Sequence, residues 1–297
     1  MNFADFGMDT ASLAGALEAK LAAVHAAGFR QVMVSAADVV SHPAGTDAAV
    51  EALRASGLRV TGFAVLRDFE GLGGHLHDYK LDIAKAMLST CDRVGSRLLL
   101  VEASVSTHAQ TDATSIVRDL RKLAMLAIPF GIRIAFKALP WSRTVHHYLA
   151  AADLTYRAGC PNIGIAIDSL HFFTDQGSDL EELDTLEPDR IMLVQLSDSM
   201  WHRLRSTNEQ VETATHFRVF PGEGVHSETL AALVRRLDNL GYYGDYSLAV
   251  YNDDYRQLAP EVVADRARDA AVWLGETVLR RSLPVPNLEH LRGPRSA

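Results

Sequence analysis

Residues 111–138 read TDATSIVRDLRKLAMLAIPFGIRIAFKA and contain, in order, an amphipathic stretch, a glycine and a short apolar run. In the stretch 111–131, apolar residues recur at spacings of three and four, which predicts a helix. Gly131 is typical of a helix C-cap, and the run 133–138 after it is typical of a buried strand. This sequence of helix, glycine and strand is the unit from which we predict the fold.

The same unit recurs along the chain. Amphipathic stretches at 13–28 and 227–241 resemble the one at 111–131, and glycines close the predicted helices at positions 28, 57, 95, 131, 159 and 241. The predicted strands are 2–8, 31–36, 59–65, 97–102, 133–138, 162–168, 190–196 and 245–251. Eight strand–helix units predict an α/β fold with a single (β/α)8 TIM barrel. The alternative is a doubly wound open sheet, but no glycine-rich phosphate motif follows the first strand.

The barrel domain is predicted to span residues 1–276. The tail 277–297 is rich in Pro and Arg and is expected to be a partly ordered extension, available for a homo-oligomer contact. Two segments that follow strands, 66–78 and 197–224, are longer than the other connections. In a barrel such loops lie at the C-terminal face, where substrates bind.

Composition narrows the class of protein. The chain has 297 residues, of which 48% are hydrophobic, and a net charge of -8, so we expect a well-formed core and no nucleic-acid partner. No apolar run reaches the roughly 18 residues of a membrane span, and the N-terminus lacks the pattern of a secretion signal. Cys91 and Cys160 match no metal or redox spacing, and we interpret them as buried thiols of a cytoplasmic protein. The expected partner is a small molecule or another protein.

Polar residues follow the predicted strands, and each could be no more than a cap or a loop hydrogen-bonding group. Together, at one end of a barrel, they predict a binding site or an active site. Lys137, Asp168 and Gln195 end the fifth, sixth and seventh strands. The ends of the second, third and fourth strands contribute Asp38, Arg67, Asp68, Glu70 and Glu102.

Three further residues extend this candidate site. His171 follows Asp168 by three positions and can face the same cavity if a turn forms there; a structural histidine is the alternative. His216 and Arg218 lie in the long loop 197–224 and could clamp an anion, because Arg offers a two-pronged donor to a carboxylate. Alternatively, Arg218 holds the loop by bonding local carbonyl groups.

Several motifs resemble those of the sugar phosphate isomerase/epimerase superfamily, the xylose-isomerase-like TIM barrels, and most of all the bacterial 3-dehydroshikimate dehydratases. Order and spacing agree from about residue 10 to residue 275. The motifs are LRDFEG (66–71), ALPWSR (138–143), NIGIAIDSLHFF (162–173), LVQLSDS (193–199), HFRVFPGEG (216–224) and YSLAVYNDDYR (246–256).

The resemblance implies a divalent metal, Mg, Mn or Co, held by Glu, Asp, Gln or His, and Glu at strand ends. Here the Asp matches Asp168 and the Gln matches Gln195, but the first Glu falls on Lys137 and the last on Ala249. A further family glutamate falls on Met33. Two carboxylates removed and one ammonium added shift the local charge by about +3, so we expect no metal cofactor in the family position. Glu102 and Asp38 could serve as substitute ligands.

Three hypotheses follow. The first is a metal-independent lyase or isomerase acting on a small keto or hydroxy acid. In it Lys137 replaces the metal as cation, base or Schiff-base amine, Asp168 pairs with Lys137, and His171 moves the proton. Arg67, Asp68, Glu70, Glu102, Gln195, His216 and Arg218 would then bind an anionic substrate. The second is a non-catalytic barrel that binds a ligand or a partner subunit, and the third is a metal-dependent enzyme with ligands recruited elsewhere.

Overall fold

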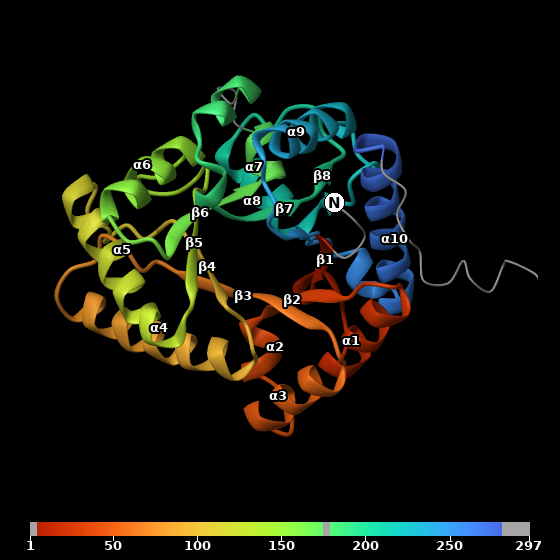
Figure 1. Ribbon diagram of the computed structural model, residues 1–297, viewed down its shortest axis with the longest axis horizontal. Helices are drawn as coiled ribbons and strands as arrows, with labels where there is room; N and C mark the ends of the chain where they lie inside the picture. Colours follow the sequence, from red (N-terminus) through yellow and green to blue (C-terminus); the bar gives the residue numbers. More distant parts are fainter. Residues whose placement is uncertain (1–4, 175–178, 281–297) are drawn as a thin grey trace, which may run out of the picture.

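A computed structural model describes residues 5–174 and 179–280 of the chain, which form a closed barrel of eight parallel strands surrounded by helices (Figure 1). Around the barrel the order is β1-β10-β7-β6-β5-β4-β3-β2, so each strand lies beside its neighbours in the chain. The barrel strands are β1 (Phe6–Asp9), β2 (Gln31–Ser35), β3 (Arg59–Arg67), β4 (Leu98–Glu102), β5 (Arg133–Lys137), β6 (Ile163–Asp168), β7 (Ile191–Leu196) and β10 (Tyr246–Leu248). The predicted TIM barrel is confirmed.

Most of the helices cover the outside of the barrel, whereas α8 lies in the long connection after β7 (Figure 1). They are α1 (Leu17–Ala26), α2 (Ala36–Val40), α3 (Thr46–Ala55), α4 (Gly74–Arg93), α5 (Ala113–Ala127), α6 (Tyr148–Ala158), α7 (Ser169–Thr174), α8 (Thr207–His216), α9 (Ser227–Leu240) and α10 (Pro260–Val272). The quoted stretch 111–131 forms α5 and a 3-10 turn, Ile128–Phe130, and Gly131 follows with φ 63°. Because only glycine adopts this left-handed conformation without strain, Gly131 turns the chain directly into β5.

The ends of several strands differ from their predicted positions. β1 ends at Asp9, one residue beyond the predicted 2–8, while residues 2–4 of that prediction lie outside the described part of the chain. β3 continues to Arg67, and β10 ends at Leu248, short of the predicted 251. Hydrogen bonds to neighbouring strands decide these ends, and a single strand's apolar pattern does not contain them.

The long connection after β7 has its own structure. β8 (Asp198–Ser199) pairs antiparallel with β9 (Arg218–Val219), and α8 lies between them. This arrangement returns the predicted loop 197–224 to the mouth of the barrel and fixes the position of Arg218.

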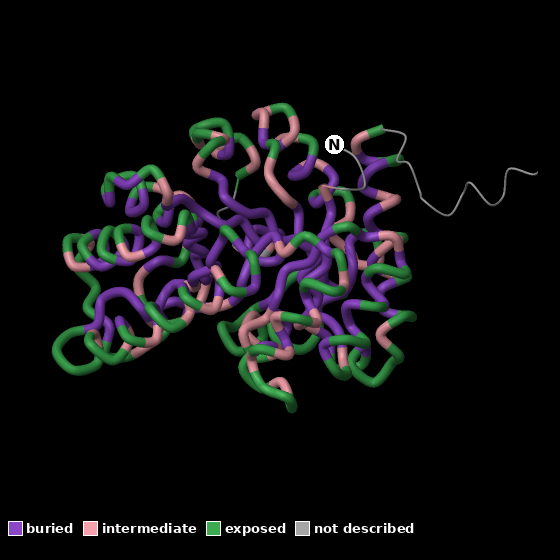
Figure 2. Tube along the Cα trace, turned by 60° about the horizontal axis from the view of Figure 1, so that its bottom comes forward, coloured by how far each residue is buried: buried purple, intermediate pink, exposed green. Residues whose placement is uncertain are grey.

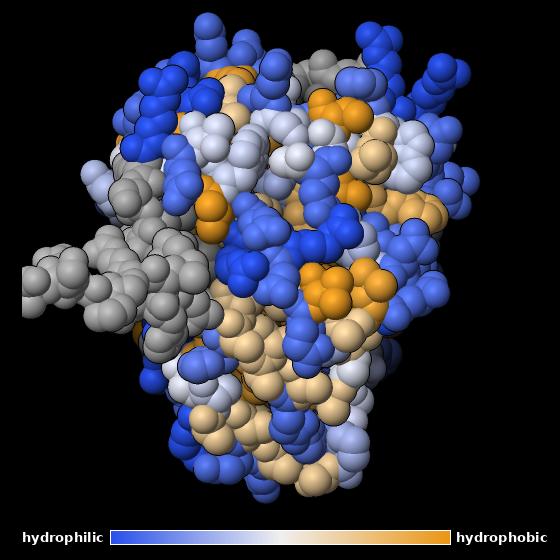
Figure 3. All heavy atoms as spheres, turned by 90° about the vertical axis from the view of Figure 1, so that its right-hand side faces the viewer, coloured by the Kyte–Doolittle hydropathy of each residue, from blue (hydrophilic) through white to orange (hydrophobic). Residues whose placement is uncertain are grey.

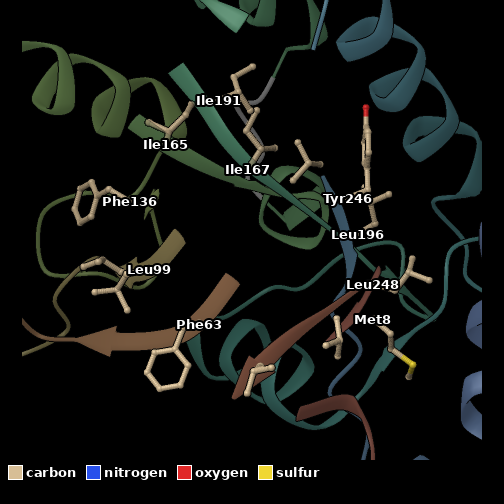
Figure 4. Close-up of a cluster of buried hydrophobic side chains, with 14 of the residues drawn as sticks. Met8, Phe63, Leu99, Phe136, Ile165, Ile167, Ile191, Leu196, Tyr246 and Leu248 are labelled. Carbon is tan, nitrogen blue, oxygen red and sulfur yellow. The ribbon is translucent and has the colours of Figure 1, made fainter. Parts of the chain in front are cut away.

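The core has two layers, because side chains alternate between the two faces of each strand. Between strands and helices lies a large outer layer that includes Phe63, Leu99 and Phe136 (Figure 4). Inside the barrel lies a small one: Met33, Ala64, Leu98, Leu100, Ala135, Ala166, Met192 and Leu193. Burial is accordingly concentrated in the strands, and exposed residues lie on the peripheral helices and loops (Figure 2).

The surface is mixed in character. On the face seen in Figure 3, strongly hydrophobic residues form small separate groups among hydrophilic ones. Within the described ranges, none of the helices has the length and apolar composition needed to cross a membrane. Cys91 and Cys160 are both buried, as expected. The boundary after residue 276 and the oligomer contact stay predictions, and residues 281–297 of the expected extension lie outside the described part of the chain.

Candidate active site

Four polar side chains enter the barrel interior at the carboxyl ends of adjacent strands. In β5, Ala135 faces the interior, Phe136 faces the helices, and Lys137 therefore faces the interior again. The same alternation directs Glu102 of β4, Asp168 of β6 and Gln195 of β7 inward. Strand register aligns Glu102 with Lys137 and Asp168 with Gln195; because Lys137 itself pairs with Ala166, its long side chain reaches the second pair, and the four side chains meet in one layer of contacts.

Lys137 is at the centre of this layer and is 1% exposed. Its Nζ donates to Gln195 Oε1 at 2.8 Å and lies 3.1 Å from Glu102 Oε1 and 3.4 Å from Asp168 Oδ2. Two carboxylates and one amide oxygen thus supply acceptors for the three N–H groups of an ammonium. The sequence predicted a pairing of Lys137 with Asp168, and the structure adds Glu102 and Gln195 to it.

An arginine lies at each end of this arrangement. Arg67 Nε donates to Glu102 Oε2 at 2.8 Å. At the opposite end, Arg218 Nη1 lies 3.0 Å from both carboxylate oxygens of Asp168. The order Arg67–Glu102–Lys137–Asp168–Arg218 alternates in charge, and we refer to these five residues as the ion-pair row. With three cations and two anions, the ion-pair row is net positive.

The cations of the ion-pair row keep its carboxylates ionised. Burial alone would raise the pKa of Glu102, but Lys137 and Arg67 outweigh it and lower the pKa to about 2. Burial also opposes ionisation of Asp168, whose pKa is nevertheless lowered by Arg218, His171 and Lys137. Both side chains are therefore acceptors at neutral pH, unsuited to donate a proton.

His171, in α7, is positioned as a neutral base. Its Nδ1 lies 3.3 Å from the carbonyl oxygen of Ala138, which can only accept, so Nδ1 carries the hydrogen. Nε2 then has the lone pair, 3.5 Å from Arg218 Nη2. Burial lowers the pKa of His171 to about 4, with Asp168 opposing and Lys137 and Arg218 adding to the shift. The imidazole packs edge-on against Trp141, with ring centroids 5.0 Å apart.

A cavity of about 520 Å³ opens above the ion-pair row. Of the predicted site residues, Arg67, Asp68, Glu102, His171 and Arg218 line its wall. Lys137, Asp168 and Gln195 lie beneath this wall, each at most 4% exposed. The structure thus brings eight of the ten predicted residues to one place, in two layers.

Glu70 and His216 are placed differently. Glu70 is buried in the loop after β3, where its Oε1 accepts from the Ser104 backbone N–H. Burial raises its pKa to about 7. His216 is exposed and its Nδ1 bonds Asp253 Oδ2 at 2.9 Å. Neither side chain is among those that line the cavity, so the described geometry gives Glu70 a loop-holding contact and His216 a surface contact.

Asp68 has a mixed position. It lines the cavity, yet its Oδ1 accepts from Ser104 Oγ at 3.1 Å and from the backbone N–H groups of Val105 and Ser106 at 2.9 and 3.1 Å. These hydrogen bonds hold the Asp68 carboxylate against the loop that follows β4. Asp38, considered above as a substitute metal ligand, pairs instead with Lys20 at 2.7 Å.

Sequence reasoning missed Asp9 and Tyr251, which also line the cavity. The Tyr251 hydroxyl donates to Asp9 Oδ2 at 3.1 Å. Asp9 ends β1, so the rule that selected the other strand-end residues would have included it had β1 been predicted one residue longer. Tyr251 lies within a quoted motif, but nothing in its sequence context distinguishes it from a core aromatic residue.

The four positions at which the family resemblance implies a metal do not fit a divalent ion. The Lys137 ammonium occupies the point where Asp168 and Gln195 converge, and Ala249, which is buried, provides no donor. Within residues 5–174 and 179–280, no group of three or more His, Cys, Asp or Glu side chains could hold a metal ion. A cation beside a cation is repelled, so the donor set present is that of an ammonium.

Comparison with known proteins gives consistent matches over most of the chain. A family model described as "Xylose isomerase-like TIM barrel" matches residues 21–276. A 3-dehydroshikimate dehydratase of Pseudomonas aeruginosa is 32% identical over 292 residues, which are 97% of this chain and 45% of that protein. An inosose isomerase of Bacillus licheniformis is 24% identical over 192 residues, 63% of this chain and 66% of that protein. The chain spans less than half the length of the dehydratases that it matches.

Solved structures give the same result. A "xylose isomerase-like TIM barrel/4-hydroxyphenylpyruvate dioxygenase fusion protein" superposes with a TM-score of 0.85 at 29% identity, covering 98% of this chain and 45% of that one. The IolI protein with a bound zinc atom superposes with a TM-score of 0.78 at 19% identity, covering 94% and 99%, a likeness of fold alone. These matches agree with the resemblance drawn from the motifs.

Proposed function

The chain belongs to the xylose isomerase-like TIM barrel family, and from this premise we propose that it is a lyase or isomerase acting on a small anionic keto or hydroxy acid, with Lys137 in place of the family's divalent metal. Similarity to 3-dehydroshikimate dehydratases supports an anionic keto acid, whereas inosose, the compound in the name of the other relatives, is an uncharged ketone and supports the keto group alone. Both reaction types begin with the loss of a proton from a carbon beside a carbonyl group, so one site can serve either.

The observation that carries the proposal is the position of the Lys137 ammonium. It lies within 3.4 Å of acceptors from three different strands, where the family resemblance implies a metal. Lys137 does not line the cavity, but it holds the two carboxylates of the net positive ion-pair row, whose end residues Arg67 and Arg218 line the cavity wall and can stabilise negative charge that develops on a substrate oxygen. Lys137 thereby supplies part of the electrostatic effect of a metal ion without offering a coordination site.

The Schiff-base alternative is less well supported. A lysine that attacks a carbonyl needs a neutral amine and access to the substrate. Lys137 is 1% exposed and lies beneath the cavity wall, against two carboxylates that stay ionised. The enolate version of the hypothesis is therefore the one we propose.

His171 is proposed as the base that takes the proton. Its Nε2 has the lone pair and faces Arg218 at the cavity wall. With a pKa of about 4 it is neutral at physiological pH and can accept a proton there. The nearby guanidinium of Arg218 would hold the enolate oxygen or a carboxylate of the substrate.

The positive charge at the mouth of the cavity favours an anionic substrate. Arg67 and Arg256 both line it, with side chains 65% and 47% exposed. Together with the net positive ion-pair row, they favour a carboxylate over a neutral sugar.

A chelator experiment tests the proposal. Purified protein is treated with a chelator, its metal content is measured, and it is incubated with 3-dehydroshikimate or with inosose while products are followed by mass spectrometry. We expect turnover of 3-dehydroshikimate, the anionic compound, without metal and with no gain on adding Mn²⁺; turnover of inosose alone would contradict the preference for an anion. Stoichiometric metal that is lost together with activity would instead support ligands recruited elsewhere.

A non-catalytic barrel is the second candidate, and one observation favours it. All three N–H donors of Lys137 are directed at protein acceptors, so Lys137 does not contact a ligand in the cavity directly. Calorimetry distinguishes the two: this candidate predicts that an anionic keto acid binds but is recovered unchanged. A cytoplasmic location remains a prediction for either candidate.

A further inference from the structure

A groove on the outside of the barrel, separate from the cavity at its mouth, lies over β6 and β7. Its volume is about 310 Å³. Ile165 of β6 and Ile191 of β7, whose side chains face the helices, form its floor. Leu149 and Ala152 of α6 contribute apolar side chains to one wall, and Leu186, in the connection before β7, contributes one to the opposite wall. We refer to this feature as the outer groove.

The outer groove is open because the connection from β6 to β7 contains little α-helix in its described residues. It has the six-residue α7 and two 3-10 helices, Leu180–Thr185 and Pro188–Arg190, whereas α5 has 15 residues. In a (β/α)8 barrel a longer helix covers the outer face of the strands beside it. Here Tyr156, at the edge of the groove, is 65% exposed.

The rim of the outer groove is acidic. Residues 179–189 contain six Asp or Glu and no Lys, Arg or His. Glu187, in the rim, has a side chain that is 67% exposed and 3.9 Å from Arg190. On α6, Asp153 lies in the same rim and pairs with Arg157 at 3.2 Å. A segment that fits this groove should therefore combine apolar side chains with positive charge.

The C-terminal segment 281–297 begins close to this rim. Near the end of the described chain, the Val278 carbonyl accepts from Arg235 Nε of α9 at 3.0 Å. The next residue of α9, Arg236, donates from Nε to Asp184 Oδ1 at 2.6 Å. Asp184 raises the pKa of Arg236 above its ordinary value and directly precedes the groove wall. Two adjacent arginines of one helix thus connect the start of the segment to the outer groove.

The sequence of the segment complements the outer groove in length and in chemistry. Seventeen residues span up to about 55–60 Å when extended, whereas the helix α9 that lies between is about 10 Å wide. Against a single glutamate, Glu289, the segment has three arginines, at positions 281, 292 and 295. Between the first and second of these arginines lie its four large apolar residues: Leu283, Val285, Leu288 and Leu291.

We propose that residues 281–297 dock in the outer groove of their own chain, with apolar side chains over Ile165 and Ile191 and with arginines against the acidic rim. The occupant is then a basic, proline-containing segment, and its docking covers the outer face of the two strands that carry Asp168 and Gln195. This inference goes beyond the proposed function and does not depend on it. A second copy of the chain or a different protein in the groove is an alternative outcome of the test.

Photocrosslinking in the full chain tests the proposal. Leu288 is replaced by p-benzoylphenylalanine, the protein is irradiated, and crosslinked peptides are identified by mass spectrometry. A mixture of ¹⁵N-labelled and unlabelled protein separates contacts within one chain from contacts between two. Ala152→Trp fills the outer groove, and Glu187→Lys reverses one rim charge. Glu51→Lys is the matched control, because the Glu51 side chain is also 67% exposed and also pairs with an arginine three residues along a helical turn.

We expect crosslinks from position 288 to residues 149–156 or 185–191 of the same chain. Ala152→Trp should lower their yield by about 10-fold or more, because the apolar side chains of the segment lose their burial. Glu187→Lys should lower the yield by about 3- to 5-fold, the effect of an exposed ion pair, and Glu51→Lys should not change it. Thermal denaturation shows that each variant is folded.

Three results would overturn the inference. The first is folded protein that forms no crosslink to either wall of the outer groove. The second is crosslinks that join labelled to unlabelled chains, which would assign the groove to a second copy. The third is an equal yield in the unchanged groove and in folded Ala152→Trp. Equal yields in Glu187→Lys and Glu51→Lys would overturn the role of the acidic rim.

Discussion

Replacing Lys137 by methionine tests whether the ion-pair row is held together by the ammonium. Methionine fills a similar volume but leaves Glu102, Asp168 and Gln195 without the donor that they share. Removing one partner of a buried ion pair costs about 3–5 kcal/mol, because a charge stays buried without compensation. Glu102 keeps Arg67 and Asp168 keeps Arg218, so we expect a value near the lower end, about 3 kcal/mol.

The pKa of Glu102 gives an independent magnitude. Its lowering from 4.5 to about 2 corresponds to about 3 kcal/mol of stability at neutral pH, which Lys137 and Arg67 share. A depressed carboxyl pKa contributes stability above the unfolded-state pKa and loses it as the pH falls toward the folded-state value. The difference between wild type and Lys137→Met should therefore be complete at pH 7 and shrink between about pH 4.5 and pH 2.

Urea denaturation at pH 7 and at pH 3.5 measures this difference. The control is Lys85→Met, since Lys85 pairs with Asp82 on the surface and exposed pairs contribute about 0–1 kcal/mol. A loss for Lys137→Met no greater than that for Lys85→Met, or one independent of pH, would refute the idea that the ammonium compensates the buried carboxylates.

Three further predictions concern the same face of the barrel. The double variant Lys137→Glu, Ala249→Glu should bind Mn²⁺ stoichiometrically in calorimetry while wild type does not, because it replaces a cation and a methyl group by carboxylates beside Asp168. Burial raises the folded-state pKa of Glu70 to about 7, so wild-type protein should lose stability as the pH rises from 4.5 to about 7, whereas Glu70→Gln should not. Denaturation midpoints across this range measure the difference between the two proteins, and a difference that does not change with pH would contradict the prediction. Arg67→Ala should raise KM for an anionic substrate by about 10-fold or more with a smaller change in kcat, because hydrogen bonds to charged groups contribute about 1.5–3 kcal/mol; an equal fall in kcat would instead place Arg67 in the chemical step.

The sequence predicted the barrel because its evidence is local and repeated. Each helix stripe and each glycine such as Gly131 is visible in a short window, and eight such units admit few arrangements. Strand ends were less accurate, since they depend on neighbours: Asp9 was missed because β1 extends one residue beyond its apolar run.

The composition of the candidate site was predictable only in part, for a geometrical reason. Alternation along a strand shows that Lys137, Asp168 and Gln195 can share one layer, because each follows an interior residue by two positions. This alternation does not predict which side chains of the loops lie above that layer. Arg218 reaches Asp168 because β9 pairs with β8, and Glu70 is directed away from the cavity because its carboxylate accepts a hydrogen bond from the Ser104 N–H. The one-dimensional sequence pattern contains neither contact.

The ion-pair row also explains how one lysine can be accommodated where the family resemblance implies a metal. A lone ammonium in a barrel interior would carry a large desolvation cost, and so would Glu102 and Asp168 without a cation between them. With Lys137 in place, each inner charge of the row has neighbours of opposite sign on both sides, at 2.8 to 3.4 Å. The excess positive charge then falls on the two ends, Arg67 and Arg218, which are the members of the row that line the cavity together with Glu102. The net positive charge of the row therefore lies on two guanidinium groups at the cavity wall, with His171 and Tyr251 beside Arg218, and not on the buried ammonium.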